Sequence, residues 1–80
     1  MSNEALFAKL KEILINEFDI EEELITLDAS IAEDLELDSI DSVELIVKVR
    51  PYLKEKIEPE AFKSVKTVQN VVDLLQPLTI

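Results

Sequence analysis

The chain has 80 residues, a net charge of −10 at neutral pH, and no His, Cys, Gly or Trp. Without His or Cys it cannot build a Ser/His triad, a disulfide or a Cys/His zinc site. The negative charge also argues against binding to nucleic acid or to anionic membranes, and it favours basic partners.

Length and hydropathy predict one domain over residues 1–80, small enough to bury only about 60–65% of the surface of its unfolded chain. The chain is 48% hydrophobic, and the lack of Gly disfavours tight hairpins, so helices are expected. No apolar run reaches the roughly 20 residues that span a bilayer, and charges run through Met1 to Phe18, unlike a signal peptide. We therefore expect a cytoplasmic protein without membrane insertion, and the high net charge favours a monomer.

A first helix is predicted from Ser2 or Asn3, either of which can cap it, to about Phe18. Apolar residues recur in it at the three- and four-residue spacing of a helix with one buried face: Leu6, Leu10, Ile13 and Leu14, with Phe18 as a further candidate.

Residues 19–37 are acidic and follow neither a helical nor a strand period. Their isolated apolar side chains are expected to pin this segment onto the core: Ile20, Leu24, Ile25, Leu27, Ile31 and Leu35. A loop of this length is commonly functional.

A second helix is predicted to begin at Ser39, with Asp38 as its N-cap and Asp41 close to a capping-box position. The helical period turns three residues inward, Leu45, Ile46 and Val49, and leaves Ile40, Val43, Glu44 and Val47 nearer to solvent. Pro51 must stop, kink or restart this helix around Arg50 to Lys54, because proline removes a backbone donor.

Pro59 suits the first turn of a short helix through Phe62, and Thr67 can cap a last helix that Pro77 terminates. The apolar stripe of that last helix consists of Val68, Val71, Val72 and Leu75. The predicted fold is all-α, a small irregular four-helix bundle of three main helices and one short helix.

Ser39 is the residue whose position says most about chemistry. It follows the acidic run Glu33 to Asp38 and falls where the second helix begins. A hydroxyl there is expected to be exposed and close to free backbone N–H groups, which favour a phosphate ester. Because the chain has no His to activate a serine, the pattern indicates covalent attachment, and we predict a protein that is not an enzyme.

The run from Asp38 to Leu45, Asp-Ser-Ile-Asp-Ser-Val-Glu-Leu, closely resembles the Asp-Ser-Leu-Asp prosthetic-group site of acyl carrier proteins. The resemblance covers nearly the whole chain. Residues 31–35 resemble the family's approach loop, and Ile57, Pro59 and the run 67–69 resemble its later landmarks.

This resemblance implies that Ser39 receives 4′-phosphopantetheine from coenzyme A through a separate phosphopantetheinyl transferase. Acyl groups, first of all those of fatty acid biosynthesis, would then travel as thioesters on this arm, and the growing chain could shelter between helices. Partner enzymes would dock through basic patches on the second helix. The acidic contacts would be Asp38, Asp41 and Glu44, and the apolar contacts Ile40, Val43 and Val47.

Two features depart from the family pattern. Glu36 lies in a stretch where a glycine is common, so the loop is expected to be stiffer or differently turned. Lys48, Arg50 and Pro51 occupy the usually acidic end of the second helix. They weaken the acidic docking face and raise the alternative of a specialised carrier for polyketide, aminoacyl or peptidyl cargo.

Other interpretations of the same residues stay open. Asp38 can act only as a cap, or it can also help to position the metal ion or phosphate during transfer. The acidic residues can be a solvated helix face, and the three apolar ones can belong to the core. The chain can also be an unmodified acidic interaction subunit, although the intact Asp38–Ser39 pair argues against that.

A calcium site is a further alternative, because Asp34, Glu36 and Asp38 alternate as in an EF-hand loop. The pattern fails at Ser39, where Gly is needed, and at Leu45, where a bidentate Glu is needed. We predict no dedicated metal site and keep weak, nonspecific binding of divalent ions as a separate hypothesis.

Overall fold

The computed structural model describes the backbone of residues 1–80 and every side chain except that of Pro59. Three α-helices form the body of the molecule: α1 (Asn3–Phe18), α2 (Ser39–Val49) and α3 (Val68–Leu75). Three 3₁₀ helices lie in the connections between them, η1 (Glu22–Leu24), η2 (Arg50–Tyr52) and η3 (Pro59–Ser64), and a fourth, η4 (Gln76–Leu78), follows α3. The predicted all-α fold is confirmed, with a short helix, η3, that is of the 3₁₀ type.

The helix α1 has the predicted ends. The hydroxyl of Ser2 accepts a hydrogen bond from the N–H of Ala5 at 3.1 Å, so Ser2 is the N-cap. At the other end Asp19 adopts a left-handed conformation with φ 59°, and the N–H of Ile20 bonds to the carbonyl of Leu14. The N–H of Asp19 bonds to the same carbonyl of Leu14, and the left-handed residue turns the chain away from the helix.

Proline determines how α2 ends. The α-helix stops at Val49, and the chain continues for one 3₁₀ turn, η2, with Pro51 in its first turn. Because Pro51 has no N–H, it cannot continue the α-helical bonding, whereas it suits the start of a new turn.

The helix α3 begins at a reciprocal cap between Thr67 and Asn70. The Thr67 hydroxyl accepts from the N–H of Asn70, and the Asn70 side chain accepts from the N–H of Thr67, both at 3.2 Å. Pro77 lies in η4, directly after the helix. The prediction for this helix is therefore confirmed at both ends.

The segment between α1 and α2 packs on the core through only some of its apolar residues. Ile20, Ile25 and Leu35 are buried as predicted, and Ile31 is partly buried. The prediction was wrong for Leu24 and Leu27, which are 45% and 39% exposed, and it missed Ala29 and Leu37, which are buried. Isolated apolar residues carry no period, so which of them face inward depends on where the loop is tied.

Backbone hydrogen bonds tie this segment to the start of α3. The N–H of Ile31 bonds to the carbonyl of Lys66 at 2.8 Å, and the N–H of Val68 bonds to the carbonyl of Ala29 at 3.1 Å. Ser30 and Thr67 form an isolated antiparallel bridge at the same place. The loop is thus held against a helix cap, and it delivers Asp38 to the start of α2 in a defined position.

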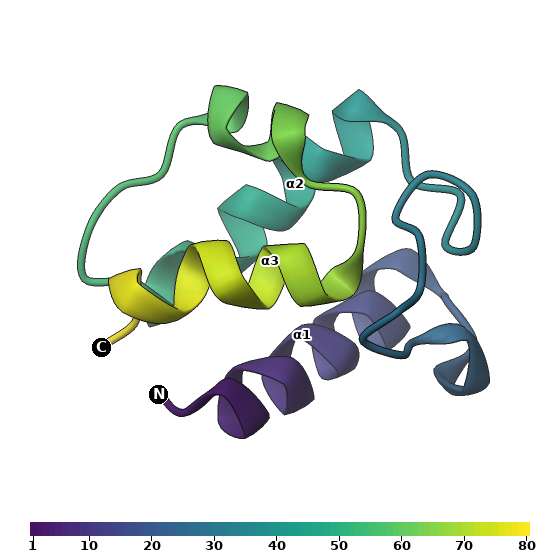
Figure 1. Cartoon of the computed structure of the whole chain (residues 1–80), viewed down its shortest axis with the longest axis horizontal. Helices are drawn as coiled ribbons and strands as arrows, with labels where there is room; N and C mark the ends of the chain where they lie inside the picture. The colour runs from purple at the N-terminus through teal and green to yellow at the C-terminus, as the bar shows by residue number, and fades with distance from the viewer.

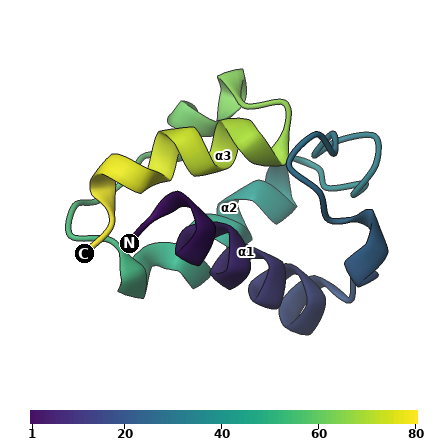
Figure 2. The same ribbon diagram turned by 60° about the horizontal axis from the view of Figure 1, so that its bottom comes forward.

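The three α-helices surround one hydrophobic core. Figure 1 shows α3 crossing the molecule between α1 and η3, and Figure 2 shows the same arrangement with the 19–38 segment at the end opposite the termini. The most deeply buried side chains include Leu10, Ile46 and Leu75, one from each α-helix. Within the part of the chain that the structure describes, no helix has the length and apolar character needed to cross a bilayer.

The two ends of the chain meet. The α-ammonium group of Met1 donates to the hydroxyl of Thr79 at 3.0 Å and to the carbonyl of Ile80 at 2.8 Å. The Thr79 hydroxyl in turn donates to the carbonyl of Gln76 at 2.7 Å, which leaves this buried polar group satisfied. This contact closes the end of the bundle opposite the loop.

Candidate functional site

Ser39 is the first residue of α2, and its side chain is exposed. Among the residues that the structure describes, nothing forms a hydrogen bond with its hydroxyl, which is therefore free to react. Ser42, one turn later, differs in both respects: it is half-buried, and its hydroxyl donates to the carbonyl of Asp38 at 3.1 Å. The structure thus distinguishes one serine from the other.

The turn before Ser39 is held by two carboxylates. Asp38 accepts from the N–H of Asp41 at 2.9 Å, and Asp41 accepts from the N–H of Asp38 at 3.2 Å. This is the predicted capping box, with Asp in place of the more usual Glu at its third helical position. The reciprocal bonds fix the direction in which the backbone presents Ser39.

The backbone around Ser39 can receive negative charge. The N–H groups of Ser39 and Ile40 have no partner within the described residues, and they belong to the first turn of α2. Unpaired N–H groups and the positive end of the helix dipole favour an anion such as a phosphate ester. The carboxylates of Asp38 and Asp41 oppose it, but both are engaged by backbone donors in the capping box.

Glu36 supplies the sharp turn that leads into this site. Its backbone has φ 54°, in the left-handed region that glycine occupies without cost. The predicted departure from the family pattern is therefore resolved: the loop adopts the conformation suited to glycine although the residue is Glu. A side chain with a Cβ is less stable in that conformation by about 1–2 kcal/mol.

Two surface hollows adjoin Ser39. The larger, of about 510 Å³, lies toward the loop and is lined by Ile31, Leu37, Val65 and Lys66, among others. The smaller, of about 200 Å³, lies between α2 and η3 and is lined by Ser42, Val43, Glu60, Phe62 and Lys63. A flexible group attached to the serine would have room on either side.

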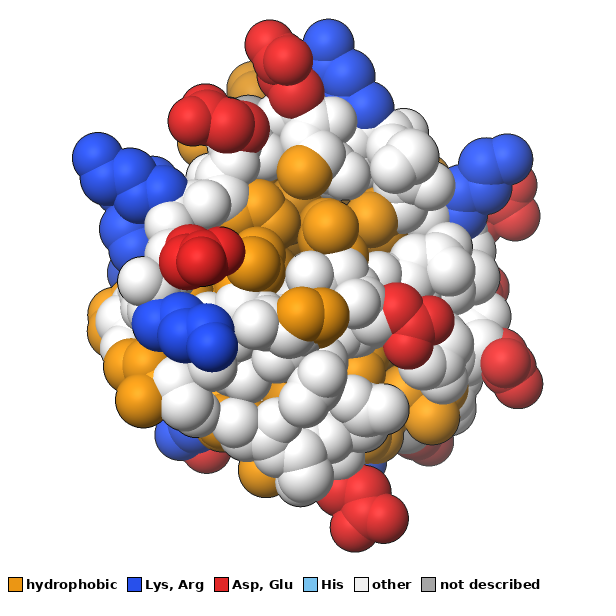
Figure 3. Space-filling view, turned by 60° about the vertical axis from the view of Figure 1, so that its left-hand side comes forward, with side chains coloured by type: hydrophobic (Ala, Val, Ile, Leu, Met, Phe, Trp, Pro, Cys, Tyr) orange, Lys and Arg blue, Asp and Glu red, His pale blue; other side chains and the backbone are white. Residues whose placement is uncertain are grey.

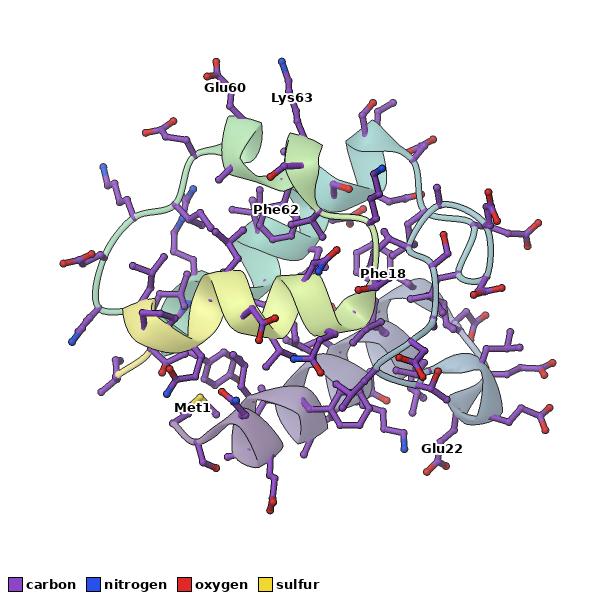
Figure 4. The ribbon with its side chains drawn as sticks, in the orientation of Figure 1. Met1, Phe18, Glu22, Glu60, Phe62 and Lys63 are labelled. Atoms are coloured by element: carbon purple, nitrogen blue, oxygen red, sulfur yellow. The ribbon has the colours of Figure 1, made fainter. Side chains whose placement is uncertain are left out.

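The residues of η3 beside Ser39 were not predicted from the sequence. Phe62 is buried and points into the molecule, whereas Glu60 and Lys63 point away from it (Figure 4). All three line the smaller hollow beside the serine. No local pattern could have shown this, because some 20 residues separate η3 from Ser39 and only the packing of η3 on α2 brings them together.

The predicted partner contacts lie on the outer face of α2. Ile40, Val43 and Val47 are exposed, so the alternative that they belong to the core is wrong. Glu44 is exposed beside them, and Asp41 is half-buried because its carboxylate serves the cap. The inward face consists of Leu45, Ile46 and Val49, as predicted.

The charge on α2 changes along its length. Lys48 near the end of the helix forms an ion pair with Glu17 of α1, with Nζ and Oε1 3.0 Å apart. Arg50 follows at the C-cap and is exposed.

Figure 3 views the end of the molecule that holds residues 53–58 and shows basic and acidic side chains around a hydrophobic area.

A second acidic surface lies on the loop side of the site. A hollow of about 440 Å³ is lined by Asp19, Glu21, Asp34, Glu36 and Asp41 together with apolar residues of the loop. Within the described residues, no three acidic side chains are grouped closely enough to hold a metal ion. This surface extends the negative charge beyond the helix itself.

Comparison with known proteins points to one chemistry. Residues 8–75 match the family model described as a phosphopantetheine attachment site. That range contains Ser39, both hollows beside it and all three α-helices in whole or in part.

Curated relatives agree over nearly the full length. The chain is 39% identical to an acyl carrier protein of Petrotoga mobilis over 75 residues, which is 94% of this chain and 88% of the relative. It is 36% identical to acyl carrier protein 2 of Ralstonia nicotianae over 78 residues, 98% of this chain and 96% of the relative. It is 37% identical to an acyl carrier protein of Coprothermobacter proteolyticus, over 95% of this chain and 93% of the relative.

Proposed function

The chain belongs to the acyl carrier protein family, and we propose that it carries acyl groups on a 4′-phosphopantetheine arm attached to Ser39, in fatty acid biosynthesis. Family and cofactor rest on the matches along the chain. The attachment residue, the pathway and the partners are the proposal. We expect the protein to act as a carrier in the cytoplasm.

The observation that carries the proposal is the state of the Ser39 hydroxyl. It is exposed, has no hydrogen-bond partner within the described residues, and lies on the first turn of α2 beside two unpaired N–H groups. A phosphodiester at this oxygen would be exposed and would lie near the unpaired backbone N–H groups, which can donate hydrogen bonds to it. The hollows on both sides leave room for an arm, so the residues present fit the group.

In this function the chain presents the Ser39 hydroxyl to other enzymes and positions the attached arm, and it catalyses no reaction itself. The 4′-phosphopantetheine arm supplies a thiol for thioester formation, which this chain without cysteine lacks. For attachment, the Ser39 oxygen must lose its proton and displace the nucleotide of coenzyme A at phosphorus. No His is available in the chain to accept that proton, so a separate phosphopantetheinyl transferase is the expected partner.

The outer face of α2 is the proposed docking surface for the transferase and for acyl-processing enzymes with basic patches. Its exposed apolar residues, Ile40, Val43 and Val47, can contact a partner while Glu44 and the Asp38–Asp41 pair attract basic side chains. Tethering an acyl group beside such a surface raises its effective concentration at each enzyme.

The test is the intact mass of the purified chain before and after incubation with coenzyme A, magnesium and a promiscuous phosphopantetheinyl transferase. We expect one phosphopantetheine to be added to the wild type and to Ser42→Ala, and none to Ser39→Ala. Ser42→Ala is the matched control because it removes the neighbouring hydroxyl on the same helix. Addition to Ser39→Ala, or no addition to an initially unmodified wild-type chain, would overturn the proposal and favour an unmodified interaction subunit.

A further inference from the structure

An apolar ridge runs along the outer face of α2. Ile40, Val43 and Val47 are 74%, 45% and 52% exposed, and their spacing of three and four residues places them on one side of the helix. The ridge is about 10 Å long at 1.5 Å per residue. Their outward sides are not covered by the rest of the chain, although Val43 also borders the hollow beside Phe62. Three exposed apolar side chains in one row form a surface that an apolar patch on a partner can contact.

The charges around the ridge differ between its two ends. At the Ser39 end lie Asp38 and Asp41, and Glu44 flanks the middle of the ridge. At the other end lies Arg50, which is exposed and has no ion-pair partner within the described residues. The ridge therefore joins an acidic end to a basic end.

Lys48 does not add to this basic end. Its ammonium is already paired with Glu17 of α1, and the hydrogen bond with that carboxylate raises the pKa of Lys48 above its ordinary value. The pair is locally neutral and draws the lysine toward α1. The free positive charge at the end of the ridge is therefore that of Arg50.

The backbone holds Arg50 in this position. It is the C-cap of α2 and the first residue of η2, and its N–H bonds to the carbonyl of Ile46. Pro51 follows in the first turn of η2 and restricts the backbone further. A basic surface brought against this arginine would meet like charge, which disfavours the wrong partner.

We propose that this ridge docks an acyl-processing enzyme whose surface is itself split in charge. The enzyme offers an apolar patch, basic side chains at the end nearest Ser39, and a carboxylate opposite Arg50. This inference rests on the proposed carrier function and narrows its partners. A uniformly basic docking surface would leave Arg50 opposed by like charge.

The experiment uses the holo chain with the purified condensing and acyl-transfer enzymes of the same organism. After loading is verified by mass, kcat and KM are measured for wild type, Arg50→Glu, Arg50→Lys and Lys56→Glu. With the enzyme that accepts the wild type best, we expect Arg50→Glu to raise KM about three- to ten-fold with kcat unchanged, the range for reversing one partly exposed pair. Arg50→Lys should stay close to wild type, and the effect should shrink in high salt.

Lys56→Glu is the control, because it makes the same charge change on an exposed residue of the segment between η2 and η3. It should change KM less than Arg50→Glu does. An unchanged or lower KM for Arg50→Glu, an equal effect of Lys56→Glu, or acceptance of the holo chain by none of these enzymes would overturn the inference. Failure of loading would instead overturn the proposed function, so the two failures are distinguishable.

Discussion

The ammonium of Lys48 on α2 lies 3.0 Å from the carboxylate of Glu17 on α1 and joins the last turns of the two helices. Glu17 is two residues before the left-handed Asp19, where the chain leaves α1 for the long loop. The pair thus links the helix that carries Ser39 to the point where its loop begins. Lys48 is also one of the basic residues by which the end of this helix departs from the family pattern.

We predict that Lys48→Met and Glu17→Gln each lower the melting temperature slightly. The double variant should melt no lower than the less stable of the two single variants. Since Glu17 raises the pKa of Lys48 above its ordinary 10.5, the pair stabilises the fold at pH values below 10.5. That stabilisation is lost as the pH rises through the raised pKa. Thermal melts of the four proteins from neutral to strongly alkaline pH test this, and additive effects would contradict the pairing.

A second prediction separates the two roles of Asp38. Asp38→Ala should lower the free energy of unfolding by about 1 kcal/mol, because the N–H of Asp41 loses its acceptor. Asp38→Asn should keep that stability, because Asn caps as well as Asp does. Denaturant unfolding measures both.

The loading rate of these same variants then tests the charge. We expect Asp38→Asn to be loaded several-fold more slowly by the transferase, because it keeps the cap but lacks a carboxylate beside Ser39. Normal loading of Asp38→Asn would leave Asp38 with the capping role alone.

The third prediction concerns the left-handed backbone of Glu36. Glu36→Gly should raise the free energy of unfolding by up to about 1 kcal/mol, because glycine has no Cβ to clash at positive φ. The gain is limited because glycine also increases the conformational entropy of the unfolded chain. Glu36→Ala removes the same charge and keeps the Cβ, so it should be less stable than Glu36→Gly. Equal stability of the two variants in denaturant would show that φ at this position is not positive in solution.

Much of the helical framework could be predicted because the signals are local. The caps at Ser2, Asp38 and Thr67 form between residues three apart, and each lies where it was expected. Pro51 ends α2 through its own missing N–H. The outward and inward faces of α2 follow from the helical period, which needs no knowledge of the rest of the fold.

The loop and the surroundings of Ser39 could not be predicted in the same way. Leu24 and Leu27 are as apolar as Leu35 and Leu37, yet only the latter two are buried. Which of them faces inward depends on how the whole loop lies on the core, and that is set in part by hydrogen bonds to the start of α3 from residues more than 30 positions away. Long-range packing also brings the η3 residues beside Ser39. It likewise brings Glu17 of α1 within ion-pair distance of Lys48.

By itself, then, the sequence determined where helices start and stop, which side of α2 faces out, and which serine stands at its beginning. The tertiary structure alone decided which loop residues are buried, that Glu36 turns as a glycine would, and that Arg50 rather than Lys48 is the free cation of the ridge within the described residues. The reason is range: caps and helical periods depend on contacts within about four residues. Burial and charge pairing depend on segments that meet only when the chain is folded.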